Sequence, residues 1–548
     1  SGVIVADGIL QSGHGACVAC MEWVGHIALV PAGKFALNDT SSGTDRLLGG
    51  KTTDRNTLAA TPQDWTTYRG NNSRSSLSTA KVPSAANVRW IWSPNPSFDM
   101  STELRDGIET SSTQPICLGD NVIFGTAAGS ICCLDRKTGA ELWNSPTGGR
   151  IISSPSFWEG KVYAGSGDGY VYCLNVKDGN LIWRYRVAPV ERRIMVYGHL
   201  MSAWPINANV LVQPSNSPGR NGAVAYAAAG LITDTGGVVL IALDAQAGKP
   251  IWEKRFNGLA KTAPSATGQM AWNNGSLWLH SPADGLFIID PATANVTPAI
   301  DWEKIDTHGV RVGAGEGTPQ QVTQEHIRHS TAMTSKGQEI GVLPGGWVVV
   351  GGKQFYVNAD DVSQNRNQCT FLKTKPDGVP LNADGYPDFL SLPKLLDTST
   401  MPAWDDREIF FPGTNNQPAV LCTGLPSLLG SAIEAHPFSA TAAAKNWWIE
   451  GLINAIKSTF PSNQQRPALP TAMNREKVLS PLLASNAIVF VHGHDTTWHV
   501  SAVTRTDPTI LWSVILPAQP TAGGLSMTGV GDVLIPLIDG RVVCVGVP

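Results

Sequence analysis

The sequence predicts an all-β fold built from one repeated unit of short antiparallel strands. Residues 121–143 (NVIFGTAAGSICCLDRKTGAELW) and residues 161–183 (KVYAGSGDGYVYCLNVKDGNLIW) follow the same pattern, and their closing tryptophans lie 40 residues apart. Each copy has an apolar run, a small-residue turn, a second apolar run, a polar turn ending in glycine, and a tryptophan. Short strands repeated at this period are typical of a β-propeller with one blade per repeat.

The residue types within the unit explain its strands and turns. The middle strand, such as VIFG at 122–125, is apolar at every position because neighbouring blades would cover both of its faces. The polar turns end in Gly139 and Gly179, where a positive φ is expected. The closing tryptophans are expected to pack between blades, since a Trp side chain buries a large apolar area.

Units of this kind are expected throughout residues 64–548, the predicted propeller domain. Their approximate bounds are 113–144, 151–184, 200–253, 262–302, 330–373, 401–425 and 478–513. The final piece, GDVLIPLIDGRVVCVGVP, lacks an outer strand, and the early segment NVRWIW, ending at Trp92, lacks inner ones. We expect the early strand to complete the last blade and close the ring, which removes exposed edges. This gives eight four-stranded blades, or seven if 401–425 is not a blade.

Two stretches differ from the repeat. Residues 1–63 are interpreted as an N-terminal segment and linker, connected to or left from an upstream region. Residues 426–475 are interpreted as an insertion with one or two short helices, because Leu, Ile and Ala recur there at helical spacing.

Composition excludes several classes of function. The net charge is −4 and the pI about 6.3, so no basic field favours nucleic acid. The sequence contains no run of 18 apolar residues, so it predicts no membrane span. The nine cysteines are an odd number, and Cys133, Cys173 and Cys544 share one repeat position, which favours small buried residues over a disulfide framework.

The segments LDRKTGAELW, LNVKDGNLIW and LDAQAGKPIW resemble the repeat of the pyrroloquinoline-quinone (PQQ)-like propellers. That superfamily includes quinoprotein alcohol dehydrogenases and outer-membrane assembly factors of the BamB type. The segment DWTTYRGNNSRSS also resembles the start of the propeller in uncharacterised exported proteins of planctomycete-type bacteria. This resemblance implies a periplasmic or extracellular location.

Cys132 and Cys133 form an adjacent pair. In quinoprotein alcohol dehydrogenases a vicinal disulfide covers the quinone, so the resemblance makes the pair a candidate for binding PQQ, alongside calcium. Within a strand, however, successive side chains point to opposite faces. The carboxylate base, calcium ligands and Trp floor of those enzymes have no identifiable counterparts, which favours a chain without a cofactor.

Two histidine-containing patterns are candidate metal sites. His14, Cys17, Cys20 and His26 lie within HGACVACMEWVGH, where the C-x-x-C pair could bind zinc, form a disulfide, or remain as structural thiols. His492 and His494 alternate along a predicted strand and would share one face, where His499 or Asp495 could join them.

Arg192, Arg193 and His199 lie between the second and third predicted blades. Loops of this kind line one face of a propeller, where ligands commonly bind, so these residues are candidates for contacting an anionic partner.

Two functions remain open from the sequence. The first is a non-catalytic, exported propeller that serves as a binding, scaffold or assembly module for a protein partner or for other copies of itself. The second is a PQQ-dependent oxidoreductase. We favour the first, because the repeat is clear and a catalytic set is not, although a fold alone does not decide function.

Overall fold

The structure is a computed structural model of the chain, and it describes most of the repeat region and short parts of the remaining segments. The described residues are 3–6, 9–12, 27–29, 46–49, 58–94, 112–196, 199–215, 222–230, 237–256, 264, 266, 268–281, 285–299, 311–312, 320–321, 340–350, 370–375, 378–380, 389–391, 401–406, 408–411, 420–423, 477–494, 497–505, 510–521 and 523–547.

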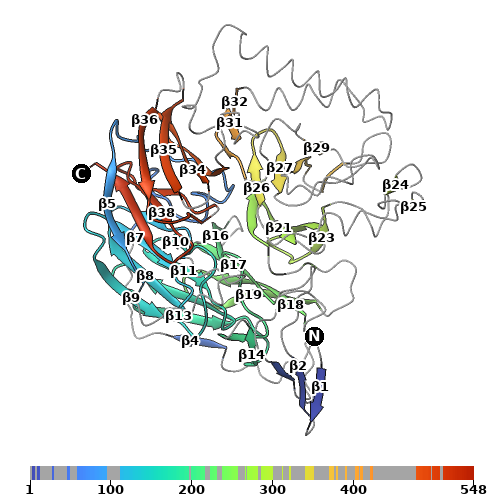
Figure 1. Cartoon of the computed structure of the whole chain (residues 1–548). Helices are drawn as coiled ribbons and strands as arrows, with labels where there is room; N and C mark the ends of the chain where they lie inside the picture. Colours follow the sequence, from blue (N-terminus) through green and yellow to red (C-terminus); the bar gives the residue numbers. More distant parts are fainter. Residues whose placement is uncertain are drawn as a thin grey trace.

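Antiparallel sheets of consecutive strands repeat along the chain and lie side by side around a common centre (Figure 1). Five sheets have four strands in simple chain order. Their strands are β6 (Ile116–Leu118), β7 (Asn121–Gly125), β8 (Ser130–Asp135) and β9 (Glu141–Pro146); β16 (Leu211–Pro214), β17 (Ala223–Ala229), β18 (Val238–Asp244) and β19 (Pro250–Phe256); β20 (Met270–Asn273), β21 (Ser276–Ser281), β22 (Gly285–Ile289) and β23 (Val296–Pro298); β26 (Ile340–Leu343), β27 (Trp347–Val350), β28 (Thr370–Lys373) and β29 (Phe389–Ser391); and β33 (Lys477–Leu483), β34 (Ala487–His494), β35 (Thr497–Thr504) and β36 (Ile510–Leu516).

Three further sheets vary this pattern. One gains a fifth strand, because β4 from the N-terminal part pairs with the outer strand β13. One has three strands, and the C-terminal sheet takes its fourth strand, β5, from the early part of the chain. Their strands are β10 (Ser156–Trp158), β11 (Lys161–Gly165), β12 (Tyr170–Asn175), β13 (Leu181–Arg186) and β4 (Leu47–Gly49); β30 (Ala403–Trp404), β31 (Glu408–Phe411) and β32 (Val420–Thr423); and β37 (Ser526–Met527), β38 (Val533–Pro536), β39 (Val542–Gly546) and β5 (Asn87–Trp92).

Small sheets account for the other strands. They are β1 (Val3–Ala6), β2 (Ile9–Ser12) and β3 (Ile27–Leu29); β14 (Arg193–Val196) and β15 (His199–Ser202); and β24 (Arg311–Val312) and β25 (Gln320–Gln321). The described residues form no helix, and hence none that could cross a membrane. The helices expected within 426–475 lie outside the described residues.

The closing tryptophans join successive sheets, as the sequence predicts. Trp143 Nε1 donates a hydrogen bond to the carbonyl of Val176 at 3.0 Å, in the turn after the third strand of the next sheet. A Cβ on Gly179 (φ 70°) would lie 2.5 Å from Trp143 Cε3, so the indole ring packs directly on this glycine. Equivalent indole bonds join Trp90 to Arg136, Trp183 to Ala245 and Trp252 to Pro291, whereas Trp512 bonds to Pro83, which precedes β5.

The repeated cysteines leave space for these tryptophans. Cys133 lies directly opposite Trp143 in the strand pairing, and Cys173 lies opposite Trp183. Both cysteines are fully buried and directly precede a β-bulge. A small side chain at this position allows the large ring to turn toward the next sheet, which confirms their interpretation as small buried residues.

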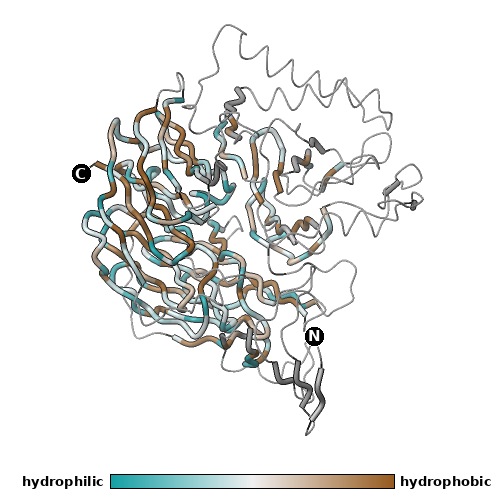
Figure 2. The backbone as a smooth tube through the Cα atoms, in the orientation of Figure 1, coloured by the Kyte–Doolittle hydropathy of each residue, from teal (hydrophilic) through white to brown (hydrophobic). Residues whose placement is uncertain are grey.

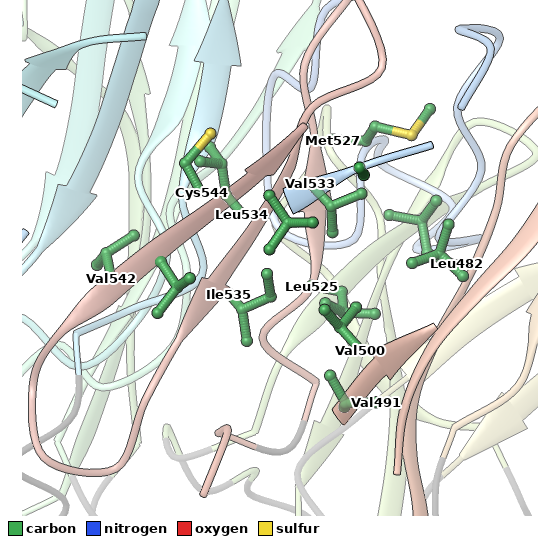
Figure 3. Close-up of a cluster of buried hydrophobic side chains, with 14 of the residues drawn as sticks. Leu482, Val491, Val500, Leu525, Met527, Val533, Leu534, Ile535, Val542 and Cys544 are labelled. Atoms are coloured by element: carbon green, nitrogen blue, oxygen red, sulfur yellow. The ribbon is translucent and has the colours of Figure 1, made fainter. Parts of the chain in front are cut away.

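Many strands of the repeated sheets are apolar, as the brown parts of the tube in Figure 2 show. Figure 3 shows the core between the sheets β33–β36 and β37–β39, where Val491 and Val500 face Leu525, Val533 and Ile535. The β6–β9, β10–β13 and β16–β19 sheets each share buried cores with two neighbouring sheets, and this explains why their middle strands are apolar throughout.

A buried carboxylate, that of Asp532, holds β5 and links the C-terminal sheet to the β6–β9 sheet. Asp532 Oδ2 accepts 2.8 Å bonds from Arg89 Nη1 on β5 and from Arg136 Nη1 in the turn after β8. Arg136 also pairs with Asp120 at 2.8 Å. The C-terminal sheet is therefore joined to the β6–β9 sheet by charged groups as well as by apolar packing.

Residues 64–80, here called the central segment, occupy the middle of the molecule. The carbonyls of Thr66, Asn72 and Ser76 accept backbone hydrogen bonds from first strands of three different sheets. Trp65 exchanges two backbone bonds with Cys117 on β6. Further bonds reach β16, β26 and β30, from Asn72 Nδ2 to Val212, from Val342 to Ser73 and from Trp404 to Ser75. The first strands face the common centre, so the chain itself fills that position.

Candidate functional site

The turn between β11 and β12 organises a polar site on one end of the five-stranded sheet. Asp168 in this turn is buried, and its Oδ2 accepts bonds from Tyr172 Oη at 2.6 Å and Gly148 N at 2.9 Å. Its Oδ1 accepts a bond from Tyr170 N at 3.1 Å. Burial, together with the charge of Asp168, raises the pKa of Tyr172 well above its usual value, so its phenol remains a donor.

Arg184 on β13 is held by this group. Its guanidinium lies 5.0 Å from the ring centre of Tyr170 and 5.9 Å from that of Tyr172, and Nη1 donates to Tyr172 Oη at 3.4 Å. Its Nε is buried without an acceptor in the described part of the chain. A guanidinium fixed on two aromatic rings is preorganised to bind a carboxylate.

Four other arginines lie around the same turn. Gly167 N in the turn bonds to Arg150 O at 2.8 Å, and Gly167 O accepts from Ser202, which pairs with Arg193 in the β14–β15 hairpin. The five residues, here called the arginine face, are Arg150, Arg184, Arg186, Arg192 and Arg193. Among the described acidic residues of these loops, Glu191 is exposed and Asp168 is buried. The local charge is therefore positive although the chain is net acidic.

Apolar side chains border the arginine face. Leu200 on β15 is 55% exposed, and Ile152, two residues after Arg150, is 42% exposed. Apolar anchors beside arginines are a composition that protein-binding surfaces share. The arrangement suits a partner with carboxylates and a few apolar side chains.

The structure places the predicted loop residues at this site. Arg193 begins β14 and lies 3.7 Å from Glu191, while Arg192 is half-buried and its carbonyl accepts from Ala203. His199 begins β15 opposite Val196. The loop residues Arg192 and Arg193 named from the sequence thus form one edge of the arginine face.

The central members of the polar site, Asp168, Tyr172 and Arg184, were missed from the sequence. Their signal was present, since YVY at 170–172 and WRY at 183–185 alternate on paired strands. In a repeat of buried strands these residues resemble ordinary core positions, and only the pairing of Tyr172 with Arg184 brings them together.

Cys132 and Cys133 point into different cores. Cys132 packs with Trp90 and Phe124 toward the C-terminal sheet, and Cys133 packs with Trp143 toward the five-stranded sheet. Both thiols are free, and burial raises the pKa of each to about 12.

These residues do not fit a quinone cradle. The two thiols face opposite sides of β8, and the central segment fills the position on the common axis. Within the described residues no three His, Cys, Asp or Glu side chains come together as metal ligands.

The predicted metal sites are placed only in part. His492 is buried, and its Nε2 lies 2.7 Å from Ser501 Oγ. Its ring stacks on His499, with centres 5.3 Å apart. His494 ends β34 opposite Thr497, and its side chain is outside the described set. The set His14, Cys17, Cys20 and His26 also lies outside the described residues.

Comparison with known proteins points to one family of repeats. The family model described as outer membrane protein assembly factor BamB matches residues 83–195 and 203–309. BamB of Nitrosomonas eutropha (strain DSM 101675 / C91 / Nm57) is 34% identical over 68 residues, which is 12% of this chain and 16% of that relative. The chain therefore matches only a small part of the relative's length.

Similar solved structures include a methanol dehydrogenase and a BamB protein. A europium-containing methanol dehydrogenase has a TM-score of 0.43 at 11% identity, covering 87% of this chain and 90% of its own. BamB from Moraxella catarrhalis has a TM-score of 0.30 at 12% identity, covering 78% and 82%.

Proposed function

We propose that this chain, a β-propeller of PQQ-like repeats, is a non-catalytic binding or assembly module that docks an acidic protein partner on its arginine face. The observation that carries the proposal is the half-buried guanidinium of Arg184, which is fixed by stacking on Tyr170 and Tyr172. Arginines in this state are frequent anchors of protein interfaces.

The match to the BamB repeat supports an assembly role, because that model describes an outer membrane protein assembly factor. The same likeness supports an exported location, periplasmic or extracellular, as part of this proposal. We also infer that the eight sheets form one closed ring with β5 as the closing strand. The pairing of β5 with β39 and the Asp532 links to Arg89 and Arg136 support this closure.

The oxidoreductase alternative would use PQQ and calcium. Cys132 and Cys133 lie on opposite faces of β8, so no described contact favours that chemistry over docking.

The test is affinity purification of the tagged full chain from its native host. We expect to recover a stoichiometric partner with an acidic surface. The amount recovered should fall at least tenfold with the double change Arg184→Gln and Arg193→Gln. Arg541→Gln is the matched control, since Arg541 pairs with Asp539 in the C-terminal sheet, away from the arginine face. Recovery of the chain alone, or a partner that the double variant retains, would contradict the proposal. Alcohol oxidation by the chain supplied with PQQ and calcium would favour the alternative.

A further inference from the structure

Two fully buried arginines lie in the central segment. Arg69 is 1% exposed and Arg74 is not exposed at all. Arg69 donates to the carbonyls of Arg74 and Pro402 and lies 5.8 Å from the ring centre of Trp404.

The contacts of Arg74 are also neutral. Its Nε donates to Met270 O at 2.9 Å, and its Nη1 donates to Thr67 Oγ1 and to the carbonyls of Tyr68 and Asn71 at 3.0–3.2 Å. Among the described residues, no carboxylate forms a salt bridge with either arginine. Two positive charges therefore lie at the centre of the molecule without a described counter-charge, a costly arrangement for buried ions.

Two buried side-chain donors, one on Arg74 and one on Asn209, lack acceptors. Arg74 Nη2 and Asn209 Nδ2 are both buried and have no hydrogen-bond partner in the described structure. Asn209 is itself fully buried, and its Oδ1 accepts from Met270 N at 3.4 Å. An unpaired buried donor costs free energy that a bound acceptor would recover.

The backbone of Met270 brings these two donors together. In a β-strand the N–H and C=O of one residue point to the same edge, so Asn209 and Arg74 lie side by side on the inner edge of β20. In a guanidinium, Nη2 donates on the same side as Nε, which is here bonded to Met270 O. Arg74 Nη2 and Asn209 Nδ2 thus border one position near the common centre.

We propose that a small inorganic anion of the halide class binds between Arg74 Nη2 and Asn209 Nδ2 and supplies the missing negative charge. A water molecule could accept both hydrogen bonds but would leave the arginine charges uncompensated. Burial lowers the pKa of Arg74 to about 9, as expected for a cation with no counter-charge. The anion would fix the central segment, through which several sheets are held together.

The direct test is a crystal structure of the full chain grown in sodium bromide, with data collected at the bromine absorption edge. We expect an anomalous peak within hydrogen-bond distance of Arg74 Nη2 and Asn209 Nδ2. A water-sized peak without anomalous signal would overturn the proposal, as would a side-chain rearrangement that satisfies both donors internally.

A second test uses Asn209→Asp, which places a fixed carboxylate beside Arg74. We expect the thermal midpoint of the natural chain to rise by about 2 °C when chloride replaces gluconate at constant ionic strength. Asn209→Asp should lose this response, whereas Asn180→Asp, an equal charge change in an exposed turn, should keep it. An identical chloride response in all three proteins would contradict the site, and so would no response in any of them.

Discussion

At the scale of single residues, the contact between successive sheets needs a tryptophan on one sheet and a glycine on the next. Trp143 packs on Gly179, and the same geometry recurs where Trp183 packs on Gly248 and Trp90 on Gly139. Each glycine has a positive φ of 68–71° and lacks the Cβ that the ring would strike. The tryptophan and glycine of successive units were therefore predictable from the sequence because each is local to its own repeat.

Replacing Gly179 with Ala should destabilise the chain by about 2–4 kcal/mol, since the new Cβ would overlap the Trp143 ring and the backbone would remain at positive φ. Urea denaturation measures the change. Gly119→Ala is the control, because Gly119 also has positive φ (58°) but has no atom within 4 Å of a new Cβ. It should cost only the backbone term, about 1 kcal/mol. Equal losses in both variants would show that ring contact is unimportant.

The buried cysteines should be unreactive in the folded chain. Burial raises the pKa of Cys132, Cys133 and Cys544 to about 12, so at pH 8 these thiols are almost wholly protonated, and the reactive thiolate forms only as the pH approaches that value. Thiol labelling at pH 8 followed by peptide mapping should modify them only after unfolding. A Cys132–Cys133 disulfide in the mapped peptides would contradict the separation of the two side chains.

At the scale of elements, the strand β5 connects the early and late parts of the chain. It pairs with β39, sends Trp90 onto Gly139, and contributes Arg89 to the carboxylate of Asp532. Three strands at the C-terminus without a fourth, and one early strand without partners, were enough to predict this pairing from sequence.

Asp532→Ala should destabilise the chain by about 3–5 kcal/mol, because it leaves Arg89 and the buried Arg136 without their shared carboxylate. Asp539→Ala removes a more exposed ion pair with Arg541 and should cost about 1 kcal/mol or less. Denaturation midpoints of the two variants compare these effects directly. If Asp532→Ala were as mild as the control, the charged groups would contribute little to holding β5 in place.

Other elements could not be predicted. β4 adds to β13 through Arg46, which donates to Arg186 O and Val187 O and pairs with Glu253 at 2.7 Å. The two hydrogen bonds join residues 140 and 141 positions apart, and no periodicity in the sequence indicates them. The path of the central segment depends in the same way on many separate sheets at once.

At the scale of the whole molecule, the described sheets carry loops at the ends of their strands. The central segment bonds to the first strands of several sheets, and the arginine face lies on loops at the ends of strands. The sequence analysis named Arg192 and Arg193 as candidates but not Arg184, since stacking on Tyr170 and Tyr172 exists only after strand pairing.

Binding at the arginine face should weaken as salt rises, because exposed charges several ångströms apart are screened at a Debye length of about 8 Å in 0.15 M salt. Partner recovery should fall at least several-fold between 0.05 M and about 0.5 M sodium chloride. Recovery that does not change with salt would indicate that apolar contacts of Leu200 and Ile152 supply most of the binding free energy. It would contradict recognition of an acidic partner.

The most direct test of the docking proposal is photo-crosslinking in the native host. A photoreactive residue at position 200, on β15 beside the arginine face, should give one discrete adduct with a partner protein. The yield should fall at least tenfold when Arg184→Gln and Arg193→Gln are added, while a probe at Ile515, exposed on β36, should give no such adduct. An adduct at position 200 that is unaffected by the arginine changes, or no adduct at all, would contradict the account.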